Sequence, residues 1–197
     1  MPSIETFTKH HIGEIISTNS MLYKSLILNK EEIMTIHEMI NFQNKAKLIY
    51  RASRDGYESS DFHSHCDGIE NTVTIIKDNF NNVFGGYTSA KWKSDGIYIP
   101  DSTAFIFKLR NKSTSCKYKF KIQNHEHAIL GNSNYGPIFG IYDILIKNRS
   151  NINTGSCSIL FHAYEYSKEY IASNEFSSLS NNFNSWLTTE IEVYQIS

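Results

Sequence analysis

Short runs rich in Ile, Val, Tyr and Phe recur along this chain from residue 46 to residue 195, and they limit the possible folds more than any other feature. Gly, Asn, Asp and Ser separate the runs, with no long helical stretch between them. Such runs, bounded by turn residues, are typical of antiparallel strands. The predicted strands cover residues 46–52, 72–78, 83–89, 104–109, 117–121, 128–131, 138–141, 143–147, 157–161 and 190–195.

Many short strands at close spacing favour two antiparallel sheets, because parallel strands need long crossover connections. A β-hairpin is predicted over residues 72–89, since Asn79, Asn81 and Asn82 in its centre tolerate the positive φ of a tight turn. We therefore expect an α+β, mainly β fold, namely a two-sheet antiparallel β-sandwich with flanking helices.

Two helices are expected beside this sandwich. The first spans Lys30–Ile40, with Asn29 as its N-cap. Its less polar residues recur at helical spacing and predict one buried stripe, formed by Ile33, Ile36, His37 and Ile40. The second lies within Ser59–Cys66, opened by one of its first two serines and ended by Gly68.

Length and composition indicate one globular domain. The chain has 197 residues, of which 40% are hydrophobic and 13% aromatic, enough to form a core without metal or disulfide support. Nineteen basic and 20 acidic residues are interleaved and leave a net charge of -1. Because no basic surface results, we expect no nucleic-acid partner. We expect a monomer.

The cysteines and the first residues indicate the cellular compartment. Cys66, Cys116 and Cys157 are far apart and odd in number, as expected for reduced thiols in the cytoplasm. The first residues lack the pattern of a secretory signal, and no apolar run approaches the roughly 20 residues that span a bilayer. We expect a cytoplasmic protein without membrane insertion. Residues 1–24 are predicted to form a short arm or helix, and residues 173–185 a loop.

Residues 63–67 gather two imidazoles, a thiol and a carboxylate, which are ligand types that zinc takes. Their spacing is not that of a zinc site, and no second ligand pair is obvious. We therefore favour a short helix in which Cys66 is a small buried hydrophobic residue, and we expect no metal or cofactor. The alternative is a metal site at His63, His65, Cys66 and Asp67. The segment His125-Glu126-His127 is interpreted as an exposed turn.

A second alternative is a thiol-dependent enzyme or redox sensor that uses Cys66 with His63 or His65. Such chemistry requires an accessible thiol with a lowered pKa. The sequence has no G-x-S-x-G element, and its glycine-rich segments fit no phosphate-binding motif. We expect no catalytic residue and no enzymatic activity.

Two polar or glycine-rich segments are interpreted as structural. Gly85 and Gly86 lie within a predicted strand, which indicates a bulge or a close approach of another segment. Arg51, Arg54 and Asp55 follow the end of the first predicted strand and are expected to hold a loop through charge-assisted hydrogen bonds.

An ordered series of motifs closely resembles the TLDc domain. The principal motifs are Lys47-Leu48-Ile49-Tyr50-Arg51-Ala52-Ser53-Arg54-Asp55-Gly56-Tyr57, Cys66-Asp67-Gly68, Val83-Phe84-Gly85-Gly86-Tyr87-Thr88-Ser89 and Tyr135-Gly136-Pro137-Ile138-Phe139-Gly140. Further matching segments are residues 62–63, 73–77, 104–109, 143–144 and 190–194, with Trp92.

The resemblance covers roughly residues 25–196 and places a TLDc domain at residues 25–197, similar to single-domain, protist-like members of the oxidation-resistance type. It implies a β-sandwich and a non-catalytic protein-interaction module that protects cells from oxidative damage. It also implies binding to the vacuolar proton-pumping ATPase (V-ATPase). The signature positions, which we expect to be structural, are Arg51, Ser53, Arg54, Asp55, Gly56, Phe62, Cys66, Asp67, Phe84, Gly85, Gly86, Gly136 and Glu192.

The chain departs from the animal members of this family before the strand that begins near Ala104. Where their pattern has Tyr-Gly-x-Gly-Glu, this chain has Tyr98-Ile99-Pro100-Asp101-Ser102-Thr103. Ile141 and Tyr142 also stand where a further glycine would be expected. These differences affect the expected partner surface more than the expected fold.

Overall fold

The computed structural model describes residues 21–40, 45–165, 170, 178–180 and 186–197. Most of the predicted arm, residues 1–20, and most of the predicted loop at 173–185 lie outside the described residues. The elements are η1 (Met21–Lys24), α2 (Lys30–Ile40), β1 (Ala46–Arg51), α3 (Ala52–Asp55), α4 (Ser59–Cys66), β2 (Thr72–Asp78), β3 (Val83–Thr88), β4 (Asp95–Ile99), β5 (Phe105–Asn111), β6 (Thr114–Lys121), η2 (His125–His127), β7 (Ile129–Asn132), β8 (Tyr135–Phe139), β9 (Ile144–Lys147) and β10 (Thr188–Ile196).

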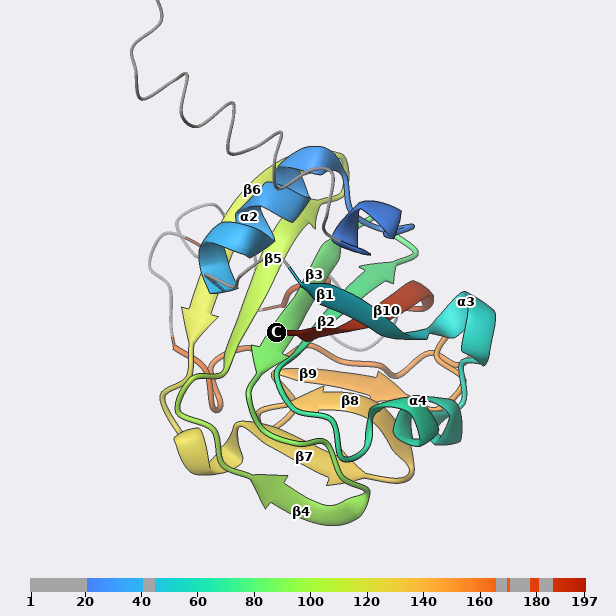
Figure 1. Ribbon diagram of the computed structural model, residues 1–197, viewed down its shortest axis with the longest axis vertical. Coiled ribbons are helices and arrows are strands. Elements are labelled where there is room, and N and C mark those ends of the chain that lie inside the picture. Colours follow the sequence, from blue (N-terminus) through green and yellow to red (C-terminus); the bar gives the residue numbers. More distant parts are fainter. Residues whose placement is uncertain (1–20, 41–44, 166–169, 171–177, 181–185) are drawn as a thin grey trace, which may run out of the picture.

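The strands form two antiparallel sheets, as predicted. The six-stranded sheet has the order β1-β10-β2-β3-β5-β6, and the four-stranded sheet has the order β4-β7-β8-β9 (Figure 1). Strand β10, the last of the described strands, therefore lies between β1 and β2. The two-sheet β-sandwich with flanking helices is confirmed. Within the described residues, no helix has the length and apolar character needed to cross a membrane.

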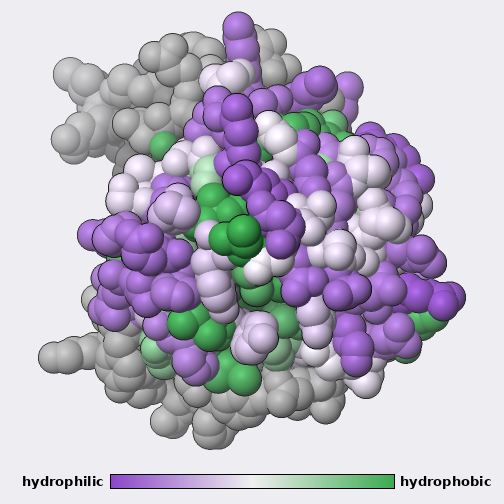
Figure 2. Space-filling model, turned by 90° about the horizontal axis from the view of Figure 1, so that it is seen from below, coloured by the Kyte–Doolittle hydropathy of each residue, from purple (hydrophilic) through white to green (hydrophobic). Residues whose placement is uncertain are grey.

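The four-stranded sheet lies at the lower end of the molecule in Figure 1, with β4 outermost. The surface seen from below carries a central band of hydrophobic side chains between hydrophilic margins (Figure 2).

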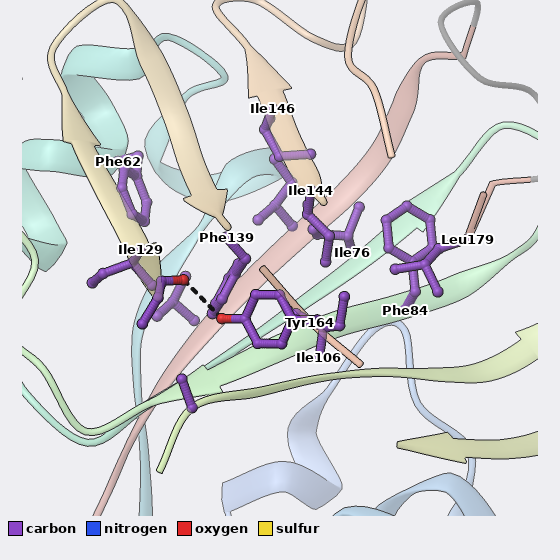
Figure 3. Close-up of a cluster of buried hydrophobic side chains, with 14 of the residues drawn as sticks. Phe62, Ile76, Phe84, Ile106, Ile129, Phe139, Ile144, Ile146, Tyr164 and Leu179 are labelled. Atoms are coloured by element: carbon purple, nitrogen blue, oxygen red, sulfur yellow. Dashed lines mark hydrogen bonds between the residues drawn. The ribbon is translucent and has the colours of Figure 1, made fainter. Parts of the chain in front are cut away.

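The main core fills the space between the two sheets. Phe84 and Ile106 from the six-stranded sheet and Phe139 and Ile144 from the four-stranded sheet are all fully buried there (Figure 3). The hydroxyl of Tyr164 donates a 2.7 Å hydrogen bond to the carbonyl of Ala128 within this core. The polar end of a buried tyrosine is thereby satisfied, as burial requires.

A second core lies on the other face of the six-stranded sheet, beneath η1 and α2. Helix α2 begins as predicted: Asn29 Oδ1 accepts a bond from the backbone N–H of Glu32, and the Glu32 carboxylate accepts one from the N–H of Asn29. This reciprocal cap satisfies two N–H groups that the first turn leaves free. Ile33 and Ile36 are buried against the sheet, and Ile40 is partly buried.

One predicted strand is absent, and one observed strand was not predicted. Residues 157–161 do not form a strand, because only Cys157 pairs, in an isolated bridge to Leu145, and Phe161 turns the chain with a φ of 82°. Strand β4 was not predicted, since Asp95 and Gly96 at its start suggest a loop. A bulge that places two β4 residues, Gly96 and Ile97, opposite the single residue Gly131 of β7 lets this segment pair.

The start of α4 and the end of β1 also differ from expectation. Helix α4 begins at Ser59, but its cap is Glu58 rather than one of the serines, because Glu58 and Asp61 exchange side-chain bonds to each other's backbone N–H. Strand β1 ends at Arg51 instead of residue 52, and a single helical turn, α3, follows at once.

The paired glycines of β3 lie where other atoms come very close, as predicted. A Cβ atom on Gly85 would lie 1.9 Å from the backbone carbonyl oxygen of Thr74 on β2. One on Gly86 would lie 2.6 Å from the Phe139 ring on the opposite sheet. The glycines thus permit close packing both within the sheet and between the sheets.

We predict that Gly85→Ala lowers the free energy of unfolding by about 1–3 kcal/mol, because backbone must move to admit the methyl group. Gly136→Ala is the matched control, since its Cβ would meet the Ile146 side chain at 3.2 Å and no backbone atom closer than 3.6 Å. That strain is offset by roughly 0.4–1 kcal/mol from a less flexible unfolded chain. Urea unfolding followed by tryptophan fluorescence measures both changes, and equal losses would contradict this account.

Candidate functional site

Most of the signature positions meet at one corner of the sandwich, formed by residues 51–67 and the facing part of β10. Glu192 on β10 is fully buried at this corner. Its carboxylate accepts bonds from the Arg51 guanidinium (Nη2 at 2.7 Å), Ser25 Oγ (2.5 Å), the Leu26 N–H (2.9 Å) and the Tyr194 hydroxyl (3.0 Å). The charge is paired and fully hydrogen-bonded, which is the condition for burying it.

The turn α3 is fixed by a second set of charged contacts. The Asp55 carboxylate accepts a hydrogen bond from the backbone N–H of Arg51 at 2.8 Å. It also accepts bonds from Nε and Nη2 of the Arg54 guanidinium, each at 2.7 Å. The hydrogen bond from Arg54 is the main cause that lowers the pKa of Asp55. The carboxylate of Glu190 on β10 accepts the backbone N–H of Ser53 at 3.0 Å. These contacts agree with the expectation that these charged residues hold the loop in place.

Gly56 makes the sharp link between α3 and α4. Its φ is 115°, and a Cβ atom there would lie 2.0 Å from Asp61 Oδ2. The hydroxyl of Tyr50 donates a 2.8 Å bond to the Gly56 carbonyl. Only glycine combines this φ with so close an approach.

Helix α4 is joined to the four-stranded sheet by His63, which is buried. One ring nitrogen, Nδ1, lies 2.8 Å from Asp67 Oδ1, and Nε2 lies 3.0 and 3.1 Å from the carbonyls of Asn132 and Tyr135. Both nitrogens therefore have partners within the protein. The exposed His65 instead approaches the Asp61 carbonyl, 2.8 Å from its Nδ1.

The geometry gives no support to the metal alternative. His63 and His65 contact different partners, and nowhere in the described part of the chain do three His, Cys, Asp or Glu side chains gather as ligands.

Cys66 lies inside the main core with no exposed surface. Burial raises the pKa of its thiol, and the negative charges of Asp67 and Asp55 raise it further. A thiolate nucleophile needs the opposite environment. These observations favour the reading of Cys66 as a small hydrophobic residue.

Aromatic rings connect the corner to the rest of the core. Phe62 on α4 makes edge-to-face contacts with Tyr50 at 5.8 Å and with Trp92 at 5.2 Å between ring centroids. Trp92 in turn contacts Phe139 at 5.5 Å, and its indole N–H donates to Thr72 Oγ1 at 2.8 Å. These contacts join the corner to the main core of the sandwich.

Four signature positions lie elsewhere. Phe84, Gly85 and Gly86 are on β3 of the six-stranded sheet, and Gly136 is on β8 of the four-stranded sheet. Sequence reasoning missed two residues that the corner needs, Ser25 and Glu190. A signal for Glu190 was present, since carboxylates at alternate positions of an otherwise apolar strand are unusual and require partners.

What the corner presents to solvent is polar and of mixed charge. The exposed residues are Ser53, Arg54, Glu58, Ser60, Ser64 and His65.

The family of the chain follows from a comparison with known protein families. The family model of the TLDc domain matches residues 21–197. The chain belongs to the TLDc family. A search of the curated proteins found no significant match. The TLDc match includes every residue of the corner and places the chain in a family involved in resistance to oxidative stress.

We predict that Glu192→Gln lowers the free energy of unfolding of this TLDc domain by about 3 kcal/mol or more, because Arg51 loses the charge that it faces in a buried pair. Glu70→Gln is the matched control. The Glu70 carboxylate lies 3.7 Å from the Lys91 ammonium, and both side chains are more than half exposed. Its loss should change stability by less than about 1 kcal/mol. Chemical denaturation measures both, and similar effects would show that the buried pair is unimportant.

We also predict that Cys66 is protected from chemical modification. In a variant that retains only this cysteine, a thiol probe at neutral pH should react at least about 100-fold more slowly in the folded than in the urea-unfolded protein, because reaction requires opening of the core. Mass spectrometry over time measures the rate. A folded protein that reacts as fast as the unfolded one would restore the thiol alternative.

Proposed function

We propose that this chain is a non-catalytic, cytoplasmic protein-interaction module that contributes to resistance to oxidative damage, and that its partner is the V-ATPase. Membership of the TLDc family supports the link to oxidative stress. The partner and the non-catalytic role follow from the resemblance to family members that bind the pump and for which no enzymatic activity is accepted.

The proposed interaction role rests on how the polar side chains of the corner are paired. Its signature polar groups are already paired inside the protein: Glu192 binds Arg51, and Asp55 binds Arg54. The loop backbone between β1 and α4 is thereby rigid, and a mixed-charge rim remains exposed. A preorganised polar loop on a rigid scaffold suits partner recognition, because little entropy is lost on binding.

The thiol-dependent alternative has less support. Its nucleophile would be Cys66, which is fully buried. Its base would be His63, whose ring nitrogens face Asp67 and two backbone carbonyls, or His65, whose Nδ1 lies 2.8 Å from the Asp61 carbonyl. A reactive thiol would need a different arrangement of the corner.

The experiment is affinity capture of V-ATPase subunits by the tagged chain at low salt, with steric variants of the corner. Ser53→Arg and Ser60→Arg add bulk at exposed positions whose side chains hold no hydrogen bond or ion pair among the described residues. We expect each to weaken capture about tenfold or more, equivalent to 1.4 kcal/mol. Thr114→Arg, an equally exposed change on β6, is the matched control and should not alter it.

Two outcomes would overturn the proposal. If the unaltered chain captures no pump subunit at low salt, the V-ATPase is not its partner. If Thr114→Arg weakens capture as much as the corner variants, the corner is not the contact surface.

A further inference from the structure

A short loop, residues 24–28, joins η1 to α2 and presents one large apolar side chain to solvent (Figure 1). This side chain, Leu26, is 63% exposed. A single exposed apolar residue is common on protein surfaces and needs no explanation by itself. Leu26 differs from the other exposed apolar residues because the Glu192 carboxylate, which also holds the corner, binds its backbone.

The backbone N–H groups at the centre of this loop all have hydrogen-bond partners. That of Leu26 donates to Glu192 Oε1 at 2.9 Å. Those of Ile27 and Leu28 both donate to Ser25 Oγ, at 3.1 and 3.0 Å. The hydroxyl of Ser25 in turn donates to Glu192 Oε2. The buried carboxylate therefore fixes the loop through both its backbone and its serine.

Two arginines hold the carbonyls that flank Leu26. Arg51 Nη2 donates to the Lys24 carbonyl at 2.7 Å, and Arg110 Nη2 donates to the Ile27 carbonyl at 3.1 Å. Each guanidinium also pairs with a buried carboxylate, at 2.7 and 2.6 Å. The conformation of the loop is thus set before any partner arrives, so little entropy is lost when its apolar side chain is buried.

The exposed charges between this loop and α3 are basic. Lys24 is exposed, and the Arg54 side chain is 48% exposed. The carboxylates of Glu190 and Glu192 are buried, and each accepts hydrogen bonds inside the chain. Because opposite charges meet across protein interfaces, the surface that fits here carries carboxylates around an apolar pocket.

We propose that Leu26 is the apolar anchor of the corner and enters an acid-rimmed pocket on a V-ATPase subunit. The proposal rests on the partner proposed above and names the contact that holds it. Burial of the exposed part of a leucine side chain supplies binding energy that the mixed-charge corner alone does not. The exposed polar residues of the corner then form the rim of the interface.

Affinity capture of V-ATPase subunits over a concentration series of the tagged full chain tests the anchor. Leu26→Ala should weaken capture about tenfold or more, because the apolar contact is lost. Leu26→Met keeps the bulk and should retain capture. Ile97→Ala is the matched control, since Ile97 is 62% exposed on β4 of the other sheet, and it should change nothing. Equal urea midpoints for all four proteins show that the fold is kept.

Charge reversal tests the acidic character of the pocket. Lys24→Glu should weaken capture about tenfold at low salt and make it less sensitive to added salt. Lys147→Glu, at an exposed position of β9, is the control and should alter neither. Capture that Lys24→Glu leaves unchanged or strengthens would show that the pocket is not acidic.

The outcomes separate the anchor from the proposed function. If the unaltered chain captures no pump subunit, both are overturned. If it captures the pump and Leu26→Ala captures it equally well, the proposed function stands and the anchor is wrong. Sedimentation velocity tests the remaining occupant: self-association of the chain that Leu26→Ala abolishes would assign this contact to a second copy and overturn the proposal.

Discussion

The buried carboxylate of Glu192 is the contact on which the arrangement of this domain depends most. It joins Ser25 before α2, Arg51 at the end of β1, and its own strand β10, three segments far apart in the sequence. Glu192 therefore fixes both the segment before α2, which covers one face of the six-stranded sheet, and the end of β1, where the corner begins. Pairing with Arg51 in a site closed to water gives this contact its strength and also makes it intolerant of substitution.

Strands and helices with a strong local pattern could be predicted from the sequence, and the weakly patterned ones could not. The pair β2 and β3 was placed correctly because its apolar runs flank an asparagine-rich turn, in which Asn81 adopts a φ of 67°. Strand β4 was missed since a bulge, which depends on its neighbour β7, turns Asp95-Gly96 into strand. Residues 157–161 have strand-like composition, but only Cys157 pairs with a neighbouring strand, and Phe161 turns the chain with a positive φ.

The candidate site shows the same limit in its side chains. The motif from Arg51 to Gly56 marked the corner, and the pairing of Arg54 with its neighbour Asp55 is local enough to be expected. The partners Ser25 and Glu190 are remote in sequence, and only the position of β10 beside β1 brings them in. Burial of Cys66 likewise depends on Phe62 and Trp92 packing around the end of the sandwich, which no local spacing reveals.

The position of β10 between β1 and β2 has a consequence for biosynthesis. All the other described strands leave the ribosome before it, so β1 and β2 must wait with facing edges unpaired while the four-stranded sheet and its loops are made. Unpaired edges of this kind invite association with other chains. Until residues 188–196 are inserted, the nascent domain is a client for chaperones, and a ribosome that stalls before them releases a chain whose larger sheet is left in two parts.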